Sequence, residues 1–281
     1  MKRVFVAVLA CAVAALQACG GTERKAAEAS PLQFEAPADP KMSPAAATLR
    51  HGERLAAVLG CSGCHGKDLT GHAWSEDPRE AILFTSNLTR AVPDYDDKAL
   101  ERAIREGVRN DGSPLWVMPS DIFTHLSAAD MAALIAHLRR IAPKGEPHPR
   151  IRIGPEGRRM IAAGEIKPAD AMAREHRDVA PPRLDGRHDW ARYMVRATCS
   201  ECHGLELKGD PPGETEPSPD LAVAGTYSRE EFRRLLRTGK PTGGRKLGLM
   251  EEVALGRFVH LTDREVDAIH DYLKARALQP N

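Results

Sequence analysis

Cys61-Ser-Gly-Cys64-His65-Gly66 is the stretch that constrains the fold most, and it returns 138 residues later as Cys199-Ser-Glu-Cys202-His203-Gly204. Cys-x-x-Cys-His is the attachment sequence of a c-type haem, whose porphyrin is bound by the two thiols. The histidine that follows lies beneath the iron as its proximal ligand. Two copies with matching flanks predict two covalently bound haem c groups. Their thioether residues are Cys61, Cys64, Cys199 and Cys202, and their proximal ligands are His65 and His203.

Paired cysteines also occur in zinc ribbons, redox dithiols and disulfides. The two pairs of a zinc ribbon lie roughly 15–20 residues apart, whereas 134 residues separate Cys64 from Cys199. A redox dithiol needs a single pair and no following histidine. Any cysteine of a secreted chain could also form a disulfide. The histidine after each pair favours haem attachment over these three uses.

Length and composition set limits on the class of protein. The 281 residues are enough for about two domains. With 40 basic and 39 acidic side chains the net charge is +1, which does not suggest a nucleic-acid partner. Aromatic residues make up only 5% of the chain. A porphyrin in each half would therefore fill core volume that side chains fill in other small domains.

The first residues have the pattern of an export signal. Met1-Lys2-Arg3 precedes an apolar run over residues 4–16, which is too short for a membrane span. Leu16-Gln17-Ala18-Cys19 then resembles the cleavage box of a bacterial lipoprotein, in which the cysteine is acylated. We predict a lipoprotein-type signal over residues 1–18 and lipidation of Cys19. A plain secretory signal is the alternative, because a glutamine occupies a position that favours a small residue.

The residues after this signal bear on location. Cys19 is followed by two glycines rather than aspartate, which resembles lipoproteins sent to the outer membrane. Acyl chains contribute about 0.8 kcal/mol per buried CH₂, so several of them anchor a protein stably. Residues 19–41 are rich in Ala, Pro, Glu and Lys without a period and predict a flexible tether. We expect the protein on the periplasmic side, lipid-anchored to the outer membrane, or soluble in the periplasm if the anchor is missing.

Residues 42–142 predict a first helical domain. Apolar residues at helical spacing run into Cys61, and a second helical pattern covers residues 97–108. A third helix is predicted to begin at Ser127, which is followed by an acidic residue three positions later. Residues 74–89 show no period, and we expect an irregular stretch there.

Residues 186–278 repeat this order. A helical pattern runs into Cys199, and two later helices open with the capping-box patterns Ser228-Arg-Glu-Glu231 and Thr262-Asp-Arg-Glu265. Internal duplication of this kind indicates two copies of one unit. We therefore predict an all-α fold of two tandem domains, joined by a proline-rich connector over residues 143–185.

The sixth ligand of each iron separates electron carriers from enzymes. Met118 and Met250 lie 53 and 47 residues after the histidines of their motifs. Both follow the middle helix of their repeat and precede its last helix, so their equivalent positions predict them as axial ligands. Methionine raises the reduction potential and completes the coordination of the iron. Met160 and Met172 in the connector are the alternatives to Met250.

Further residues are candidates to contact a haem without binding its iron. Trp116 is a candidate to pack against a haem, and Arg109 to pair with a propionate. We expect the nine histidines outside the motifs at the surface and not as ligands. They are His51, His72, His125, His137, His148, His176, His188, His260 and His270. Of these, His125 and His260 precede the last helix of each half, where they could line a haem edge.

Several segments together resemble bacterial dihaem c-type cytochromes. Besides the motifs these are Ser86-Asn87-Leu88-Thr89, Leu100-x-x-Ala-Ile104-Arg-Glu-Gly107, Met118-Pro119 and Leu261-Thr-Asp-Arg-Glu265. In pattern the chain is similar to the cytochrome subunits of membrane-bound alcohol and gluconate dehydrogenases. The resemblance covers residues from about 45 to 277. It implies two class I-like mono-haem cytochrome c domains that pass electrons, although two haem motifs here replace the three of those subunits.

These features predict an exported electron carrier rather than an enzyme. Its redox partners would be proteins such as a dehydrogenase and a terminal oxidase. One alternative is a dihaem enzyme, peroxidase-like or thiosulfate-oxidising, with one open iron. Others are a cytochrome subunit of a dehydrogenase complex, and a redox sensor or haem-binding scaffold. Methionine on both irons would argue against the enzyme, because it leaves no position for a substrate.

Overall fold

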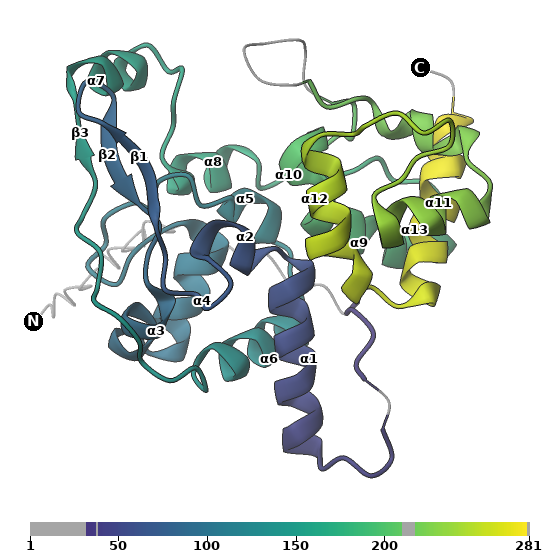
Figure 1. Ribbon diagram of the computed structural model, residues 1–281, viewed down its shortest axis with the longest axis horizontal. Coiled ribbons are helices and arrows are strands. Elements are labelled where there is room, and N and C mark those ends of the chain that lie inside the picture. Colours follow the sequence, from purple (N-terminus) through teal and green to yellow (C-terminus); the bar gives the residue numbers. More distant parts are fainter. Residues whose placement is uncertain (1–31, 38, 210–216, 280–281) are drawn as a thin grey trace, which may run out of the picture.

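The chain is mostly helical. The computed structural model describes residues 32–37, 39–209 and 217–279, so the predicted signal and Cys19 lie outside the described residues. The helices before and after the connector form two groups at opposite sides of the molecule (Figure 1). Within the described ranges, each helix is too short or too polar to cross a bilayer.

The helices fall into a first half (residues 42–142), the connector (143–185) and a second half (186–278). Those of the first half are α1 (Pro44–Val58), α2 (Cys61–His65), α3 (Leu88–Ala91), α4 (Asp97–Glu106), α5 (Ser120–Phe123) and α6 (Ala128–Leu138). The connector contains α7 (Pro155–Ala162) and α8 (Ala169–Glu175). The second half contains α9 (Asp189–Thr198), α10 (Ser200–His203), α11 (Arg229–Thr238), α12 (Leu249–Gly256) and α13 (Asp263–Ala277).

Side-chain caps begin the later helices where the sequence predicts them. The hydroxyl of Ser127 accepts a hydrogen bond from the N–H of Asp130 at the start of α6. Both capping boxes of the second half are formed, by Ser228 with Glu231 and by Thr262 with Glu265. A cap satisfies backbone N–H groups that have no partner within the helix. The predicted helix starts are therefore confirmed.

In each half the helix before the motif packs against the last helix. These pairs are α1 with α6 and α9 with α13. Gly52 allows α1 to approach α6 closely, because a Cβ at this position would lie 1.9 Å from the carbonyl oxygen of Ala133. Buried apolar side chains of both pairs belong to one continuous cluster. The two halves consequently share a core.

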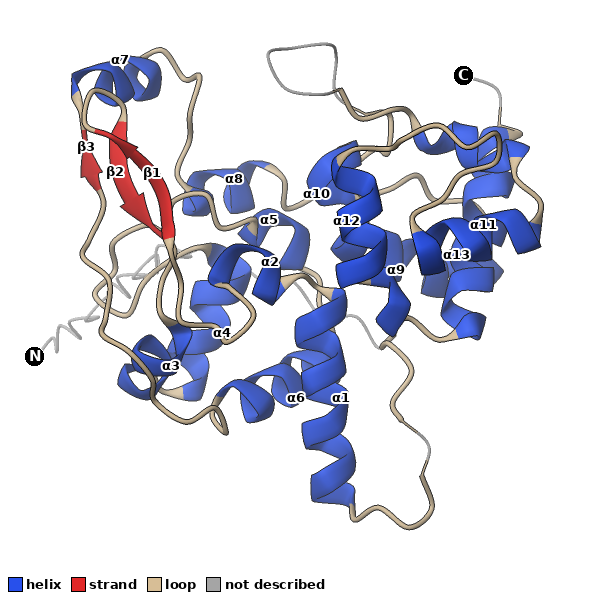
Figure 2. Cartoon of the chain, viewed as in Figure 1, coloured by secondary structure: helices blue, strands red, loops and turns tan. Residues whose placement is uncertain are grey.

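A three-stranded antiparallel sheet at one edge departs from the all-α prediction (Figure 2). β1 (Ala73–Asp77) and β2 (Ala81–Phe84) form a hairpin, and β3 (Arg152–Ile153) adds a strand from the connector. In register, Asp77 pairs with Ala81 and Ala81 with Ile153. The turn contains Pro78, and the Asp77 carboxylate accepts a hydrogen bond from the N–H of Arg79 (2.8 Å). The prediction of an irregular stretch over residues 74–89 was wrong, because strands this short show little alternation of apolar and polar residues.

Residues 32–37 lie between the two halves, although they belong to the predicted flexible tether. The side chain of Phe34 is fully buried, and its ring lies 5.6 Å from that of Tyr193 in α9. The indole N–H of Trp190 donates a hydrogen bond to the carbonyl of Gln33 (2.8 Å). Composition alone did not reveal this, because the partners of these residues lie far along the chain.

Two buried carboxylates hold this N-terminal segment. Asp130 in α6 accepts hydrogen bonds from the N–H of Phe34 (2.9 Å) and the hydroxyl of Tyr193 (2.5 Å). Glu265, at the same place in α13, accepts from the N–H of Glu35 (2.8 Å) and the guanidinium of Arg54 (2.8 Å). Each acid therefore binds the N-terminal segment and a helix of the opposite half. Unpaired buried charges are costly, so these contacts fix how the halves meet.

Two histidines that we expected at the surface are buried. His51 is 5% exposed, and its Nε2 is hydrogen-bonded to the carboxylate of Asp130 (2.7 Å). His270 is 3% exposed and donates to the carbonyl of Tyr227 (2.9 Å). The surface prediction was wrong for both because their partners lie far along the chain or belong to the backbone. Neither contact involves a haem motif.

Candidate functional site

The first motif forms a short helix that turns three side chains toward one space. Gly60 has a φ of 77° and ends α1, so that α2 can begin in a new direction at Cys61. Residues spaced by three and four positions share a helix face. Cys61, Cys64 and His65 therefore line the same cavity.

This cavity is large and mostly apolar. It encloses about 1260 Å³ of space between protein atoms, part of it open to solvent. Its wall includes Leu59, Leu88, Leu134 and Phe123, from elements spread over the whole first half. Ligand sites of this kind are concave and mostly apolar, with a few precisely placed polar groups. An apolar space beside two thiols and an imidazole suits a flat apolar group with a metal at its centre.

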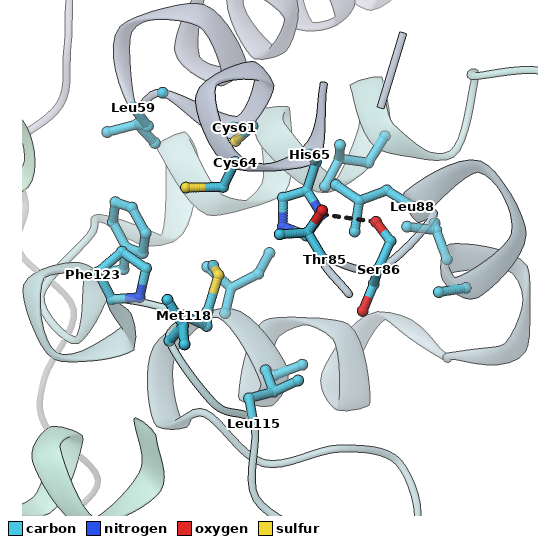
Figure 3. A pocket seen from close by; sticks show the side chains of 18 of the residues that line it. Leu59, Cys61, Cys64, His65, Thr85, Ser86, Leu88, Leu115, Met118 and Phe123 are labelled. Atoms are coloured by element: carbon cyan, nitrogen blue, oxygen red, sulfur yellow. Dashed lines mark hydrogen bonds between the residues drawn. The ribbon is translucent and has the colours of Figure 1, made fainter. Parts of the chain in front are cut away.

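The imidazole of His65 is held in the form that a metal ligand needs. Its Nδ1 lies 2.8 Å from the carbonyl oxygen of Ser86, as Figure 3 shows. Because a carbonyl only accepts, Nδ1 carries the proton and Nε2 presents its lone pair. Burial lowers the pKa of His65, which keeps the ring neutral. A backbone carbonyl behind a ligating histidine is a common device for orienting the ring.

The second motif has the same arrangement. Nδ1 of His203 donates to the carbonyl of Pro219, again at 2.8 Å. Asn87 follows the first of these carbonyls and Asp220 follows the second, and each caps a short helix with its side chain. The two histidines are consequently fixed in one tautomer by equivalent segments of their halves.

The loops after the motifs also match bond for bond. The N–H of Gly71 donates to the carbonyl of His65 (2.7 Å), and that of Gly209 donates to the carbonyl of His203 (2.9 Å). Leu69 and Leu207 both have a positive φ, 58° and 62°. This conformation is uncommon for residues other than glycine. Sharing it shows that the two loops match in backbone detail.

The thiols of the motifs are not those of a redox dithiol. Burial raises the pKa of Cys61 and of Cys199 to about 11. Burial also raises the pKa of Cys64. Catalytic dithiols have a lowered thiol pKa, which provides the reactive thiolate. The environment here argues against that alternative.

Met118 lies across the cavity from the motif. Figure 3 shows its sulfur pointing into the space opposite Cys64 and His65. It lies in a loop between Val117, whose φ is 65°, and Pro119. A β-branched residue at positive φ is an outlier that surrounding structure must enforce. The structure thus brings the predicted distal ligand of the first site to the expected wall.

Met250 occupies a different setting. It is the second residue of α12, and its side chain is half-buried against the core of the second half. Its assignment as the distal ligand of the second site stays a prediction. So does the lipidation of Cys19, which lies outside the described residues.

The other candidates divide into two groups. Arg109 and Trp116 line the cavity, and the guanidinium of Arg109 donates to the carbonyl of Pro114. Burial lowers the pKa of Arg109. The imidazole of His125 instead donates to the carbonyl of Arg177 (2.7 Å), in the connector.

Two residues of the cavity wall were missed in the sequence. Glu201 and Arg257 belong to the second half, yet both line the cavity of the first motif. They form an ion pair with a distance of 2.6 Å between Nη1 and Oε2. One signal was present, because the first motif has Gly63 at the position where the second motif has Glu201. The absent side chain leaves room that Arg257 occupies.

Comparison with known families identifies one domain. Residues 191–277 match the sequence model of the cytochrome c family. The second half therefore contains a cytochrome c domain.

Similar proteins share most of the length of the chain. The cytochrome subunit of fructose dehydrogenase from Gluconobacter japonicus is 26% identical over 260 residues, which cover 81% of this chain and 52% of that protein. The gluconate 2-dehydrogenase cytochrome c subunit of Pantoea cypripedii is 26% identical over 277 residues, covering 87% and 62%. The thiosulfate dehydrogenase electron acceptor of Thiomonas intermedia is 26% identical over 223 residues, covering 78% and 80%. The chain thus spans about half to three fifths of the first two.

Proposed function

We propose that this chain is a two-haem c-type cytochrome that carries electrons and is not itself an enzyme. In this proposal Cys61, Cys64, Cys199 and Cys202 bind the two porphyrins, and the axial ligands are His65 with Met118 and His203 with Met250. A bound haem c would supply reversible one-electron chemistry at its iron. The protein would hold the groups, exclude water from them and set their potentials.

One observation carries the proposal. Both motif histidines donate their Nδ1–H to a backbone carbonyl at 2.8 Å, within loops whose hydrogen bonds match. A core histidine needs no such repetition, whereas two proximal ligands need the same ring orientation and tautomer. The apolar cavity next to the first motif supports the same conclusion, because it places Met118 opposite His65.

The similar proteins support a function that involves both motifs. An aligned stretch that covers 87% of the chain leaves out about one residue in eight. Wherever it begins, such a stretch includes residues 61–65 and 199–203. The likeness to cytochrome subunits therefore does not depend on the second half alone. The names of these relatives describe subunits or acceptors of dehydrogenases.

The chain's own residues have distinct tasks in this function. Ser86 and Pro219 orient the proximal imidazoles through their carbonyls. Val117 and Pro119 fix the backbone on either side of the predicted distal ligand, so that Met118 stays directed into the cavity. The guanidinium of Arg109 lines the same cavity and is placed to pair with an anionic group there. Together these groups limit the structural change of the site when its iron gains or loses an electron.

We propose further that the protein acts outside the cytoplasm, with a dehydrogenase as electron donor. The predicted export signal and the box ending in Cys19 support attachment to the outer membrane through lipid. The names of the relatives support a dehydrogenase as partner. Covalent attachment of haem c is compatible with this placement.

Mass spectrometry of the mature protein from a haem-maturing host tests the proposal. The expected mass is that of the polypeptide with two haem groups, and of one group in the Cys61→Ser/Cys64→Ser and the Cys199→Ser/Cys202→Ser variants. Substitution of His270, a buried histidine outside the motifs, by Gln should leave two groups in place. A wild-type protein without porphyrin mass would falsify the proposal.

A further inference from the structure

The ion pair between Arg257 and Glu201 lies where the two motifs meet. Glu201 is inside the second motif, between Cys199 and Cys202. Arg257 directly follows α12, which ends beside the end of α1 in Figure 1. The two side chains are largely buried, with 14% of Arg257 and 22% of Glu201 exposed. Both line the cavity of the first motif.

Arg257 also contacts the backbone of the first motif. A Cβ built on Gly60 would lie 2.1 Å from Cζ of Arg257, so the guanidinium rests directly on this glycine. A Cβ on Gly63 would lie 3.5 Å from Nη2, an ordinary contact distance. The positions equivalent to these glycines in the second motif are Thr198 and Glu201. Gly60 is the position at which a side chain would exclude Arg257, and the second motif has Thr198 there.

The guanidinium of Arg257 lies close enough to Cys64 and to Cys202 for its charge to act on both motifs. Burial disfavours the charged form of Arg257. The hydrogen bond that Arg257 donates to Glu201 and the negative charge nearby together outweigh this cost, so the pKa of Arg257 is raised and the guanidinium stays charged. The pair is therefore a fixed cation and a fixed anion at the edge of the first site.

We propose that the charges of Arg257 and Glu201 set the reduction potential of the first haem-attachment site. This inference rests on the proposed function, because it concerns haem bound at Cys61–His65. The oxidised form of such a site carries one more positive charge than the reduced form. A nearby cation disfavours the oxidised form and raises the potential, and a nearby anion does the opposite. Arg257 raises the potential, and Glu201 limits that increase.

Redox titration of the charge variants tests the inference. In Arg257→Gln the midpoint potential of the first site is expected to fall, and in Glu201→Gln it is expected to rise. Each shift should change the oxidised-to-reduced ratio at a fixed potential by roughly three- to tenfold, given the low dielectric of a largely buried pair. The double variant should lie between the single ones. Titration in the Cys199→Ser/Cys202→Ser background, which leaves one attachment site, identifies the step that belongs to the first site.

Two controls separate charge from packing. Arg257→Lys keeps the charge and should keep the wild-type potential. Arg233→Gln removes one partner of the Arg233–Asp267 pair, which joins α11 to α13 within the second half, and should leave the first site unchanged. Shifts of the same sign in Arg257→Gln and Glu201→Gln would overturn the inference. So would shifts no larger than that of Arg233→Gln, or a shift in Arg257→Lys equal to that in Arg257→Gln.

The outcome is distinguishable from failure of the proposed function. The haem count from mass spectrometry decides whether both sites are loaded. The potential of the first site decides the inference even if the second site carries no haem. Glu201→Gln removes no side-chain volume, so it provides a test even if Arg257→Gln fails to fold.

Discussion

The two halves hold their motif histidines in the same way but present their predicted distal ligands differently. His65 and His203 have equivalent backbone partners at the same distance. Met118 lies in a strained loop at the wall of a cavity, whereas Met250 lies at the start of α12. The setting of each motif histidine is determined by a short local sequence that occurs in both halves. The setting of each methionine depends on tertiary packing, which differs between the halves.

Removing the two methionines separately is expected to have the largest effect. Met118→Ala should abolish the weak far-red charge-transfer band of the first site and let the reduced protein bind carbon monoxide. Its potential should fall, since axial ligands tune haem potentials over about 0.8 V. Met250→Ala should do the same at the second site. Absorption spectra and redox titration measure both.

A matched control is Met131→Leu, because Met131 is buried within α6 and lies in the core cluster. This variant should keep both bands. A full band in Met250→Ala would show that the two halves differ in the identity of their distal ligand, with Met160 and Met172 as the next candidates.

The buried carboxylates of the two last helices provide a second comparison. Glu265→Ala is expected to lower the free energy of unfolding by about 3 kcal/mol or more, because it leaves the charge of Arg54 buried without its partner. Asp130→Ala should cost less, about 1–3 kcal/mol, because it strands a hydroxyl, an N–H and the imidazole of His51 rather than a guanidinium. Urea denaturation followed by circular dichroism measures both changes.

Asp263→Ala is the control, because this carboxylate is 72% exposed and pairs with Arg237 at the surface. Its effect should stay within about 1 kcal/mol. Equal losses for Asp130→Ala and Glu265→Ala would contradict the idea that a stranded charge separates them.

The smallest expected effect distinguishes the two glycines of the first motif. Gly60→Ala should destabilise the protein by about 1–2 kcal/mol, because its φ is positive and its Cβ would meet Arg257. Gly63→Ala should be neutral or stabilising by a few tenths of a kcal/mol, since it is helical and its Cβ would make an ordinary contact. Thermal unfolding of the two variants measures the difference. A loss in Gly63→Ala as large as in Gly60→Ala would show that Arg257 needs both glycines.

Local sequence was enough to predict several parts of the fold. The caps at Ser127, Ser228 and Thr262 and the helix over residues 97–106 follow from patterns within a few residues. The cysteine pairs and histidines of the motifs are local patterns too, and their roles in binding haem stay a prediction. Met118 was proposed from its repeat position, and it lines the cavity of the first half.

Other parts of the fold depend on contacts between residues that lie far apart in the sequence. The sheet needs β3, which the connector adds to a hairpin far earlier in the chain. The burial of Phe34 requires both halves to be present. Arg257 reaches the first motif from the end of α12, and only the missing side chains of two glycines indicated that space. In each case the partners are remote in the chain, where hydrophobic periodicity carries no information.

The N-terminal segment has a consequence for the order of assembly. The hydrogen bond between Glu35 and Glu265 joins residues 230 positions apart, so it cannot form until nearly the whole polypeptide has emerged. Residues 32–37 therefore cannot contact α13 until this last helix has been synthesised. The contacts between the N-terminal segment and α13 consequently form late in folding, although residues 32–37 are synthesised early.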